Sequence, residues 1–210
     1  MAVTPATPED AAREILRCLQ SIAGFQQIRL LVTGEVAVRR YFPSHPVQQK
    51  EKVEFLVFLG DGFDHRVDEL PSEVSDLLKL KLLSMHPESF QQRLGLLEFK
   101  GRPVLFIPKE ILPYVPQGTP TIAENSIGDL PYTTATDTLI YMVMSDSIRL
   151  GRQPPGQDVR AVTNFVRHLR SQGPINFSPQ QEECLASHLD WLASSGFWDG
   201  ERWRQRLGLP

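Results

Sequence analysis

The chain has 210 residues, of which 41% are hydrophobic and 22% are charged, and this is the length and composition of one globular domain with a sizeable core. The 22 Lys and Arg residues against 25 Asp and Glu residues leave a net charge of −3, so the chain lacks the basic excess of a nucleic-acid-binding domain. The first ten residues have no secretory-signal pattern, and the apolar runs are too short to span a membrane. We therefore expect a cytoplasmic protein with neither nucleic-acid nor membrane partners.

The N-terminal half of the chain alternates between helical and strand patterns. Thr7 stands before Pro8 and two acidic residues, which is the order that caps and begins a helix. The run 53–59 is almost wholly apolar, which predicts a central strand buried on both faces. From these patterns and from the spacing of apolar residues elsewhere, we predict helices over 8–22, 35–42 and from 72 onward, and strands over 28–32 and 53–59.

The C-terminal half predicts a hairpin, then a loop, then helices. The apolar runs 94–99 and 103–107 flank Lys100-Gly101, as the strands of a β-hairpin flank their turn. The stretch 113–131 is rich in proline, which is typical of an irregular connection. After this loop, the spacing of apolar residues predicts helices over 136–150, 157–170 and 178–194.

The order of these elements predicts an α+β fold with a small mixed sheet and a helical C-terminal half. Residues 1–8 are expected to be a flexible N-terminus, and 9–210 to form a single domain whose helical part begins at about 136. Cys18 and Cys184 both lie in helix-like apolar patterns. With no further cysteines to form a disulfide framework, we expect both thiols to be reduced.

Four local patterns resemble the nucleotidyltransferase-like superfamily, and in particular its small fungal members. They are the strand, Gly turn and helix over 30–37, the strand 53–59 with Gly60-Asp61-Gly62 after it, the His86-Pro87 segment that leads to Phe90, and a helix, Arg-x-Gly loop and helix over 139–159 with Arg149, Gly151 and Asp158. The resemblance covers roughly residues 28–185. It implies a small mixed sheet of nucleotidyltransferase-like type.

Active members of that superfamily hold divalent metals with two carboxylates on the second strand and a third on a later strand. The preferred register places Val53 and Phe55 at the paired positions, and a shift by one residue places Glu54 and Leu56 there. The later strand, around Leu105, offers no acid. The resemblance therefore implies that this chain has lost the metal site, and we expect no metal, no cofactor and an apolar cleft.

Three functions are open to such a chain. An active nucleotidyltransferase is disfavoured because the carboxylates are missing. A non-catalytic binding or scaffold protein would keep the fold without the chemistry. The third function, which we favour at this point, is a cyclase or isomerase without metal or cofactor that acts on an apolar natural-product intermediate. A pericyclic step of Diels–Alder type would suit such a cleft, because it needs little beyond a held conformer and one or two hydrogen-bond donors.

The cyclase hypothesis assigns residues to two roles. The substrate-binding walls of the pocket are Thr33, Val53, Phe55, Leu105, Ile107 and Met142. The polar residues expected to act in catalysis at its rim are Glu35, Tyr132 and Arg149. The hypothesis requires an enclosed apolar cavity between the sheet and the helix predicted over 136–150. If side chains fill that space, the binding or scaffold hypothesis gains support instead. The sequence predicts no oligomeric state.

Other polar residues have simpler interpretations. The acids within 61–68 and the five histidines lack the spacing of metal ligands. His86 is expected to end a helix rather than to act as a catalyst, and Arg149 is expected to pair with Asp158 in preference to contacting a substrate. Thr133 or Thr134 is expected to cap the helix that follows them.

Overall fold

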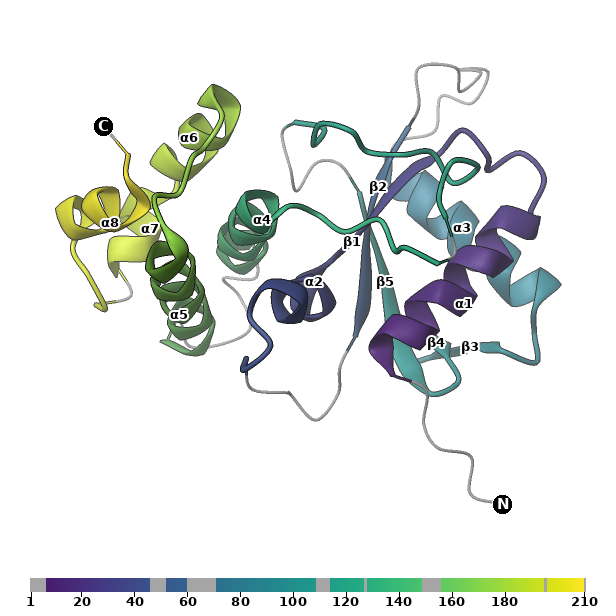
Figure 1. Cartoon of the computed structure of the whole chain (residues 1–210). Coiled ribbons are helices and arrows are strands. Elements are labelled where there is room, and N and C mark those ends of the chain that lie inside the picture. Colours follow the sequence, from purple (N-terminus) through teal and green to yellow (C-terminus); the bar gives the residue numbers. More distant parts are fainter. Residues whose placement is uncertain are drawn as a thin grey trace.

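The computed structural model describes residues 7–45, 52–59, 71–108, 114–126, 128–148, 156–194 and 196–209. These residues form a five-stranded sheet with helices on both faces and a further group of helices at one end, as Figure 1 shows. The predicted α+β class with a helical C-terminal half is therefore confirmed. Within the described ranges, no helix combines the length and the apolar character that crossing a bilayer requires.

The elements follow the predicted order closely. The helices are α1 (Pro8–Ser21), α2 (Gly34–Tyr41), α3 (Pro71–Met85), α4 (Ala135–Ile148), α5 (Gly156–Gln172), α6 (Pro179–Ala186), α7 (Leu189–Ser194) and α8 (Gly200–Leu207). The strands are β1 (Arg29–Thr33), β2 (Val53–Phe58), β3 (Phe90–Arg93), β4 (Leu96–Phe99) and β5 (Arg102–Pro108). Thr7 caps α1 as predicted, because its side chain accepts a hydrogen bond from the backbone N–H of Asp10.

Three differences from the prediction have local causes. β3 was missed because only Phe90 of its four residues is buried, so it lacks an apolar alternation. α8 was missed because its buried residues are only Trp203 and Leu207. The segment predicted as one helix over 178–194 is divided into α6 and α7. Between them the side chains of Ser187 and His188 both contact the Cys184 carbonyl oxygen, at 2.8 and 2.9 Å, and compete for a helical acceptor.

The sheet is mixed, with strand order β1-β2-β5-β4-β3. β2 and β5 run parallel, and the other neighbouring pairs are antiparallel. The register pairs Thr33 with Glu54, and Glu54 with Leu105. Because paired residues on adjacent strands point to the same face, these three side chains form a row across the sheet.

Each face of the sheet packs against its own helices. Val53 and Phe55 belong to a hydrophobic cluster with residues of α1 and α3. Leu56 and Ile107 belong to a second cluster with residues of α4 and α5. β2 is buried along its whole length, as predicted. The prediction that Val53 and Phe55 share a wall with Ile107 is wrong, because alternate residues of a strand point to opposite faces.

The connection between β5 and α4 runs along the free edge of β1. The backbone N–H of Val32 donates to the Pro131 carbonyl at 2.6 Å, and the N–H of Thr133 donates to the Val32 carbonyl at 3.0 Å. Further along, the N–H of Ile122 donates to the Ile28 carbonyl at 2.7 Å. The loop thus takes the place of a further strand and covers an edge that would otherwise be open to pairing. It also fixes where α4 begins.

Candidate functional site

Among the described residues of β1, β2 and β5, Glu54 is the one carboxylate, and it lies on the face toward α2. Glu54 is 6% exposed, and its carboxylate lies against Gly34, the first residue of α2. Gly34 has a φ of +67°, and a Cβ atom there would collide with the Glu54 carboxylate, so only glycine fits. The N-terminus of a helix carries partial positive charge. The position of Glu54 is therefore favourable without a metal ion.

The residues beside Glu54 do not complete a metal site. Glu54 and Leu56 point toward α2 and α4, whereas the preferred register had placed Val53 and Phe55 there, so that register is corrected by one residue. On the adjacent strand the neighbour of Glu54 is Leu105. Phosphoryl transfer with two metals needs several converging carboxylates. Among the residues that the structure describes, no group of three or more His, Cys, Asp or Glu side chains is placed to hold a metal.

Apolar side chains fill the space between the sheet and α4. The sheet contributes buried residues from β1, β2 and β5, and α4 contributes four more; they are Leu31, Leu56, Phe58 and Ile107 with Leu139, Ile140, Tyr141 and Val143. Each is 6% exposed or less. Leu105 and Met142 are partly buried and pack against the same cluster. The cyclase hypothesis predicted an enclosed cavity here, and the described residues at this place form one buried apolar cluster.

The structure describes two of the three residues predicted to act in catalysis, Glu35 and Tyr132. Glu35 is half-buried in the first turn of α2. Arg149 lies outside the described residues, as does the side chain of its predicted partner Asp158. Tyr132 is half-buried, and its ring lies under the guanidinium of Arg40, 4.6 Å from the ring centroid. Burial raises the pKa of the Tyr132 phenol above its usual value. Of the two residues that the structure describes, Glu35 and Tyr132, it is Tyr132 that borders an open depression.

That depression is a groove of about 330 Å³ between the loop after β5, the edge of β1 and the start of α4. We call it the loop groove. Its lining includes three carboxylates, Glu124, Asp129 and Asp137, together with Asn125 and Tyr132, and none of the described residues that line it is a Lys or Arg. Apart from Tyr132, sequence reasoning missed this groove. Its lining residues come together only because the loop pairs with β1.

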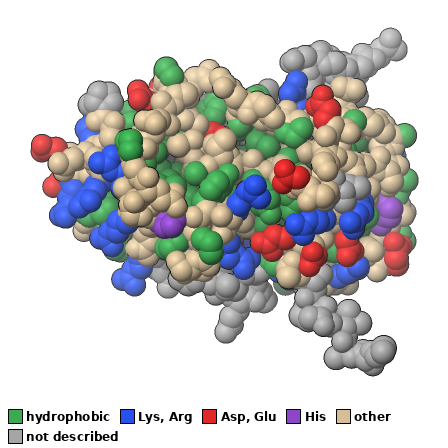
Figure 2. Space-filling model, viewed as in Figure 1, with side chains coloured by type: hydrophobic (Ala, Val, Ile, Leu, Met, Phe, Trp, Pro, Cys, Tyr) green, Lys and Arg blue, Asp and Glu red, His purple; other side chains and the backbone are tan. Residues whose placement is uncertain are grey.

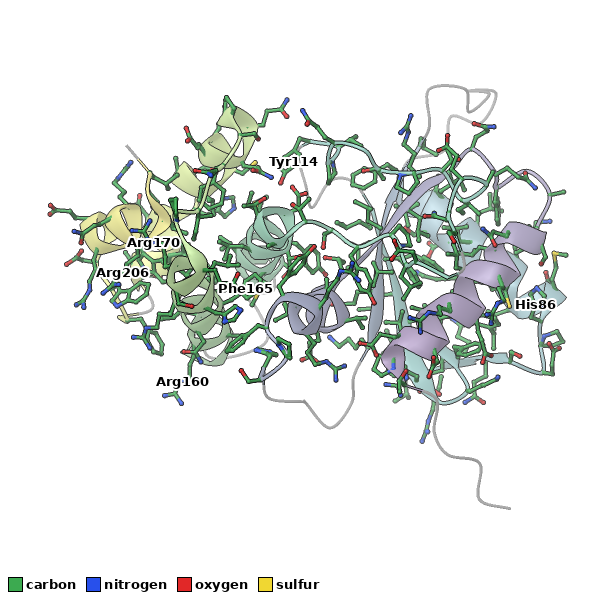
Figure 3. The ribbon with its side chains drawn as sticks, in the orientation of Figure 1. His86, Tyr114, Arg160, Phe165, Arg170 and Arg206 are labelled. Carbon is green, nitrogen blue, oxygen red and sulfur yellow. The ribbon has the colours of Figure 1, made fainter. Side chains whose placement is uncertain are left out.

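Asp137 forms one wall of the loop groove and is 3% exposed. Its Oδ1 accepts hydrogen bonds from the Tyr114 hydroxyl and from Gln181 Nε2, both at 2.7 Å. Its Oδ2 accepts one from the Thr134 hydroxyl at 2.6 Å. Figure 3 marks Tyr114 beside the N-terminal end of α4. Burial, with the Asp137 charge beside it, raises the pKa of Tyr114, so this hydroxyl stays a donor.

Thr134, rather than Thr133, caps α4. The backbone N–H of Asp137 donates to Thr134 Oγ1 at 3.1 Å. A Thr followed three residues later by an acid is a capping pattern that the sequence contains, and it is the local signal that could have located Asp137. With three donors on its carboxylate, Asp137 holds the loop, α4 and α6 together.

The other two carboxylates of the loop groove differ in their surroundings. Glu124 Oε2 accepts hydrogen bonds from the backbone N–H and the hydroxyl of Thr121, at 2.8 and 3.0 Å. These bonds lower the pKa of Glu124, so it is ionised at neutral pH. Asp129 is exposed and makes no hydrogen bond or ion pair with any residue that the structure describes.

Asn125 is a further polar residue of the loop groove. The residue is 7% exposed, and within the described part of the chain its Nδ2 has no hydrogen-bond partner. Its backbone carbonyl is already occupied, because it accepts a hydrogen bond from Gln20 Nε2 at 2.8 Å. An amide donor left unpaired in a buried place is unfavourable. Such a group indicates a place where a ligand or a water molecule completes the hydrogen bonding.

His86 follows the last residue of α3, as predicted for a residue that ends a helix. Its Nε2 lies 3.3 Å from the hydroxyl of Ser21, but that hydroxyl donates to the Cys18 carbonyl at 2.7 Å. The Ser21 proton is therefore not directed at His86, and the pair is not arranged as nucleophile and base. Cys18 and Cys184 are both free thiols, and burial raises the pKa of each.

Comparisons with known proteins give the chain a structural likeness. No model of a protein family matches it, and no curated protein does. Among solved structures, it is similar to an antigenic nucleotidyltransferase-like protein from Paracoccidioides brasiliensis. The TM-score is 0.49 and the sequence identity 16%, over 90% of this chain and 91% of that chain. A likeness of this size carries no argument about function, which has to come from the geometry of the chain itself.

Proposed function

We propose that this chain is a non-catalytic binding protein that holds a small, positively charged polar molecule in the loop groove. The observation that carries the proposal is the groove's lining, which has three carboxylates and, among the described residues, no basic side chain. Asn125, whose Nδ2 has no hydrogen-bond partner among the described residues, belongs to the same lining. The ligand class is therefore an amine that also carries hydrogen-bond acceptors, such as an amino sugar or an amino alcohol.

The dimensions and charges of the groove support a ligand of this kind. A volume of about 330 Å³ lies at the lower end of small-molecule sites. Asp137 already accepts three hydrogen bonds and acts as a wall, so Asp129 and the ionised Glu124 are the carboxylates that a ligand amine would meet. The guanidinium of Arg40 already covers the Tyr132 ring. A ligand cation would accordingly be held by carboxylates and not by that ring.

Cyclisation of an apolar intermediate receives less support from this geometry. It required an apolar cavity beside α4, where Leu56 and Ile107 instead lie in a packed cluster with α4 residues. The open groove is lined largely by polar groups, which would not favour an apolar substrate. Nucleotidyl transfer receives even less support than cyclisation, because Glu54 is the one carboxylate among the described residues of β1, β2 and β5.

The proposal is tested with three ligands that share one ring and differ in charge. Glucosamine, glucose and glucose 6-phosphate are each titrated into the full chain by isothermal titration calorimetry. We expect glucosamine to bind most tightly and glucose 6-phosphate least. Asp129→Asn should weaken glucosamine binding by about two- to fivefold, as expected for one exposed ion pair. Asp190→Asn, at an exposed carboxylate of α7 outside the groove, is the matched control.

Two results would overturn the proposal. One is an absence of glucosamine binding, or an affinity that does not change with the charge of the ligand. The other is an equal effect of Asp129→Asn and Asp190→Asn, which would mean that the ligand senses only the net charge of the chain.

A further inference from the structure

Exposed arginines gather on the helices at the C-terminal end of the chain. They are Arg160, Arg167 and Arg170 on α5, and Arg202 and Arg206 on α8, and we call them the arginine patch. Figure 2 shows basic side chains concentrated over this end of the molecule, and Figure 3 marks three of them. The whole chain carries a net charge of −3, so this positive region is a local feature.

Three of these arginines converge on one indole ring. The guanidinium carbons of Arg167, Arg206 and Arg202 lie 5.3, 5.6 and 5.9 Å from the centroid of the Trp198 ring. Cation–π attraction holds each guanidinium near the ring. Trp198 itself is 6% exposed and packs edge-on against Trp203, so it is a fixed support. The two helices thus present a preformed group of like charges.

The charges of these arginines are not taken up in ion pairs with the described residues. None of the five arginines forms an ion pair with a described residue, although salt bridges occur elsewhere, as between Lys100 and Glu14 at 2.7 Å. The nearby carboxylate of Asp199 is used otherwise, because its Oδ1 caps α8 by accepting the backbone N–H of Arg202 at 2.7 Å. Like charges that share one ring repel each other. An anionic partner would remove that repulsion.

We propose that the arginine patch binds an acidic segment of a partner protein. The planar guanidinium group matches a carboxylate with two parallel hydrogen bonds, so an arginine-only surface suits Asp and Glu side chains. Single-stranded nucleic acid is the less suitable anion. Its binding sites add exposed aromatic rings on which bases stack, whereas the Trp198 ring is buried beneath the arginines.

The test uses a fluorescently labelled peptide of ten glutamates and measures fluorescence anisotropy at low salt with the full chain. We expect Arg167→Gln with Arg206→Gln to weaken binding about fivefold. The matched control is Arg17→Gln with Arg93→Gln, which removes two exposed arginines from α1 and β3 and changes the net charge equally. It should change the affinity less than about twofold. Arg167→Lys with Arg206→Lys keeps both charges and should bind more tightly than the glutamine pair.

Three outcomes would overturn this proposal. The patch pair and the control pair could weaken binding equally, or the wild-type chain could fail to bind the peptide at low salt. A labelled ten-nucleotide thymidine strand could also bind more tightly than the peptide and lose more affinity in the patch pair, which would identify a nucleic-acid surface. Thermal unfolding of each variant, followed by circular dichroism, confirms that the exposed substitutions leave the fold intact.

Discussion

The buried carboxylate of Asp137 allows a quantitative prediction of how one substitution changes the free energy of unfolding. Asp137→Asn keeps the size of the side chain but removes its charge and replaces one acceptor oxygen with a donor. Hydrogen bonds to a charged acceptor stabilise a protein by about 1.5–3 kcal/mol, against about 1 kcal/mol for neutral pairs. Two donors would then meet a neutral amide oxygen, and the Thr134 hydroxyl would lose its acceptor.

Together, the weakened and lost hydrogen bonds should lower the free energy of unfolding by about 3 kcal/mol. Part of this loss is offset, because the variant no longer has to bury a charge. We expect a net loss of about 2–3 kcal/mol, measured by urea denaturation at neutral pH. Asp129→Asn is the matched control, because that carboxylate is exposed and has no described partner. Its effect should stay within about 0.5 kcal/mol.

A double-mutant cycle separates the hydrogen bond from general damage to the fold. Tyr114→Phe removes one donor to Asp137 and should cost about 1.5 kcal/mol alone. In the Asp137→Asn background the same change should cost clearly less, with a coupling energy of about 1 kcal/mol. A coupling energy near zero, or an Asp137→Asn variant as stable as the Asp129→Asn control, would refute the account of this network.

Three further predictions concern the rest of the chain. Gly34→Ala should lower the free energy of unfolding, measured by urea denaturation, by more than about 2 kcal/mol, because the added Cβ atom collides with Glu54 and the φ angle is unfavourable for alanine. The control is Gly24→Ala, which has a φ of +92° but lies in open space and should cost about 1 kcal/mol. Burial and the adjacent carboxylate raise the pKa of Tyr114, so the phenol loses its proton at a lower pH in the unfolded chain than in the folded one. The free energy of unfolding should therefore fall as pH rises above about 10. Tyr114→Phe should remove part of this pH dependence, measured by urea titrations. Leu56→Ala should cost about 2–5 kcal/mol in a thermal or urea unfolding assay if the space beside α4 is packed, against little for Leu80→Ala at 64% exposure, and a small effect at Leu56 would indicate a cavity there.

The sequence predicted the helices and strands more completely than it predicted how the strands pair. The apolar run of β2 correctly predicted a strand buried on both faces, because burial on both faces leaves no polar alternation. It could not show that Glu54 and not Val53 points toward α2. That choice depends on the pairing of Glu54 with Thr33 and Leu105, which are distant in sequence. A slip of one residue would have reversed both faces.

The sequence did not predict the loop groove, for a related reason. The prediction of irregular chain over 113–131 is correct for the described residues 114–126 and 128–131, but irregular chain has no periodicity from which its path could be inferred. The path is set by backbone hydrogen bonds to β1, including those of Val32 with Pro131 and Thr133. Of the described groove residues, only Thr134 and Asp137 can be recognised from the local sequence, because their spacing is that of a helix cap.

The two proposals and the state of Glu54 have a common physical basis. The Glu54 side chain beneath the first turn of α2 lies against the helix start and the glycine that makes room for it, so we assign it a structural role. Charge without a described partner lies elsewhere, at Asp129 in the loop groove and in the arginine patch. The free energy of binding comes from polar groups that the fold leaves unsatisfied. Ligand and partner should therefore be sought at these two surfaces before the buried face of β2.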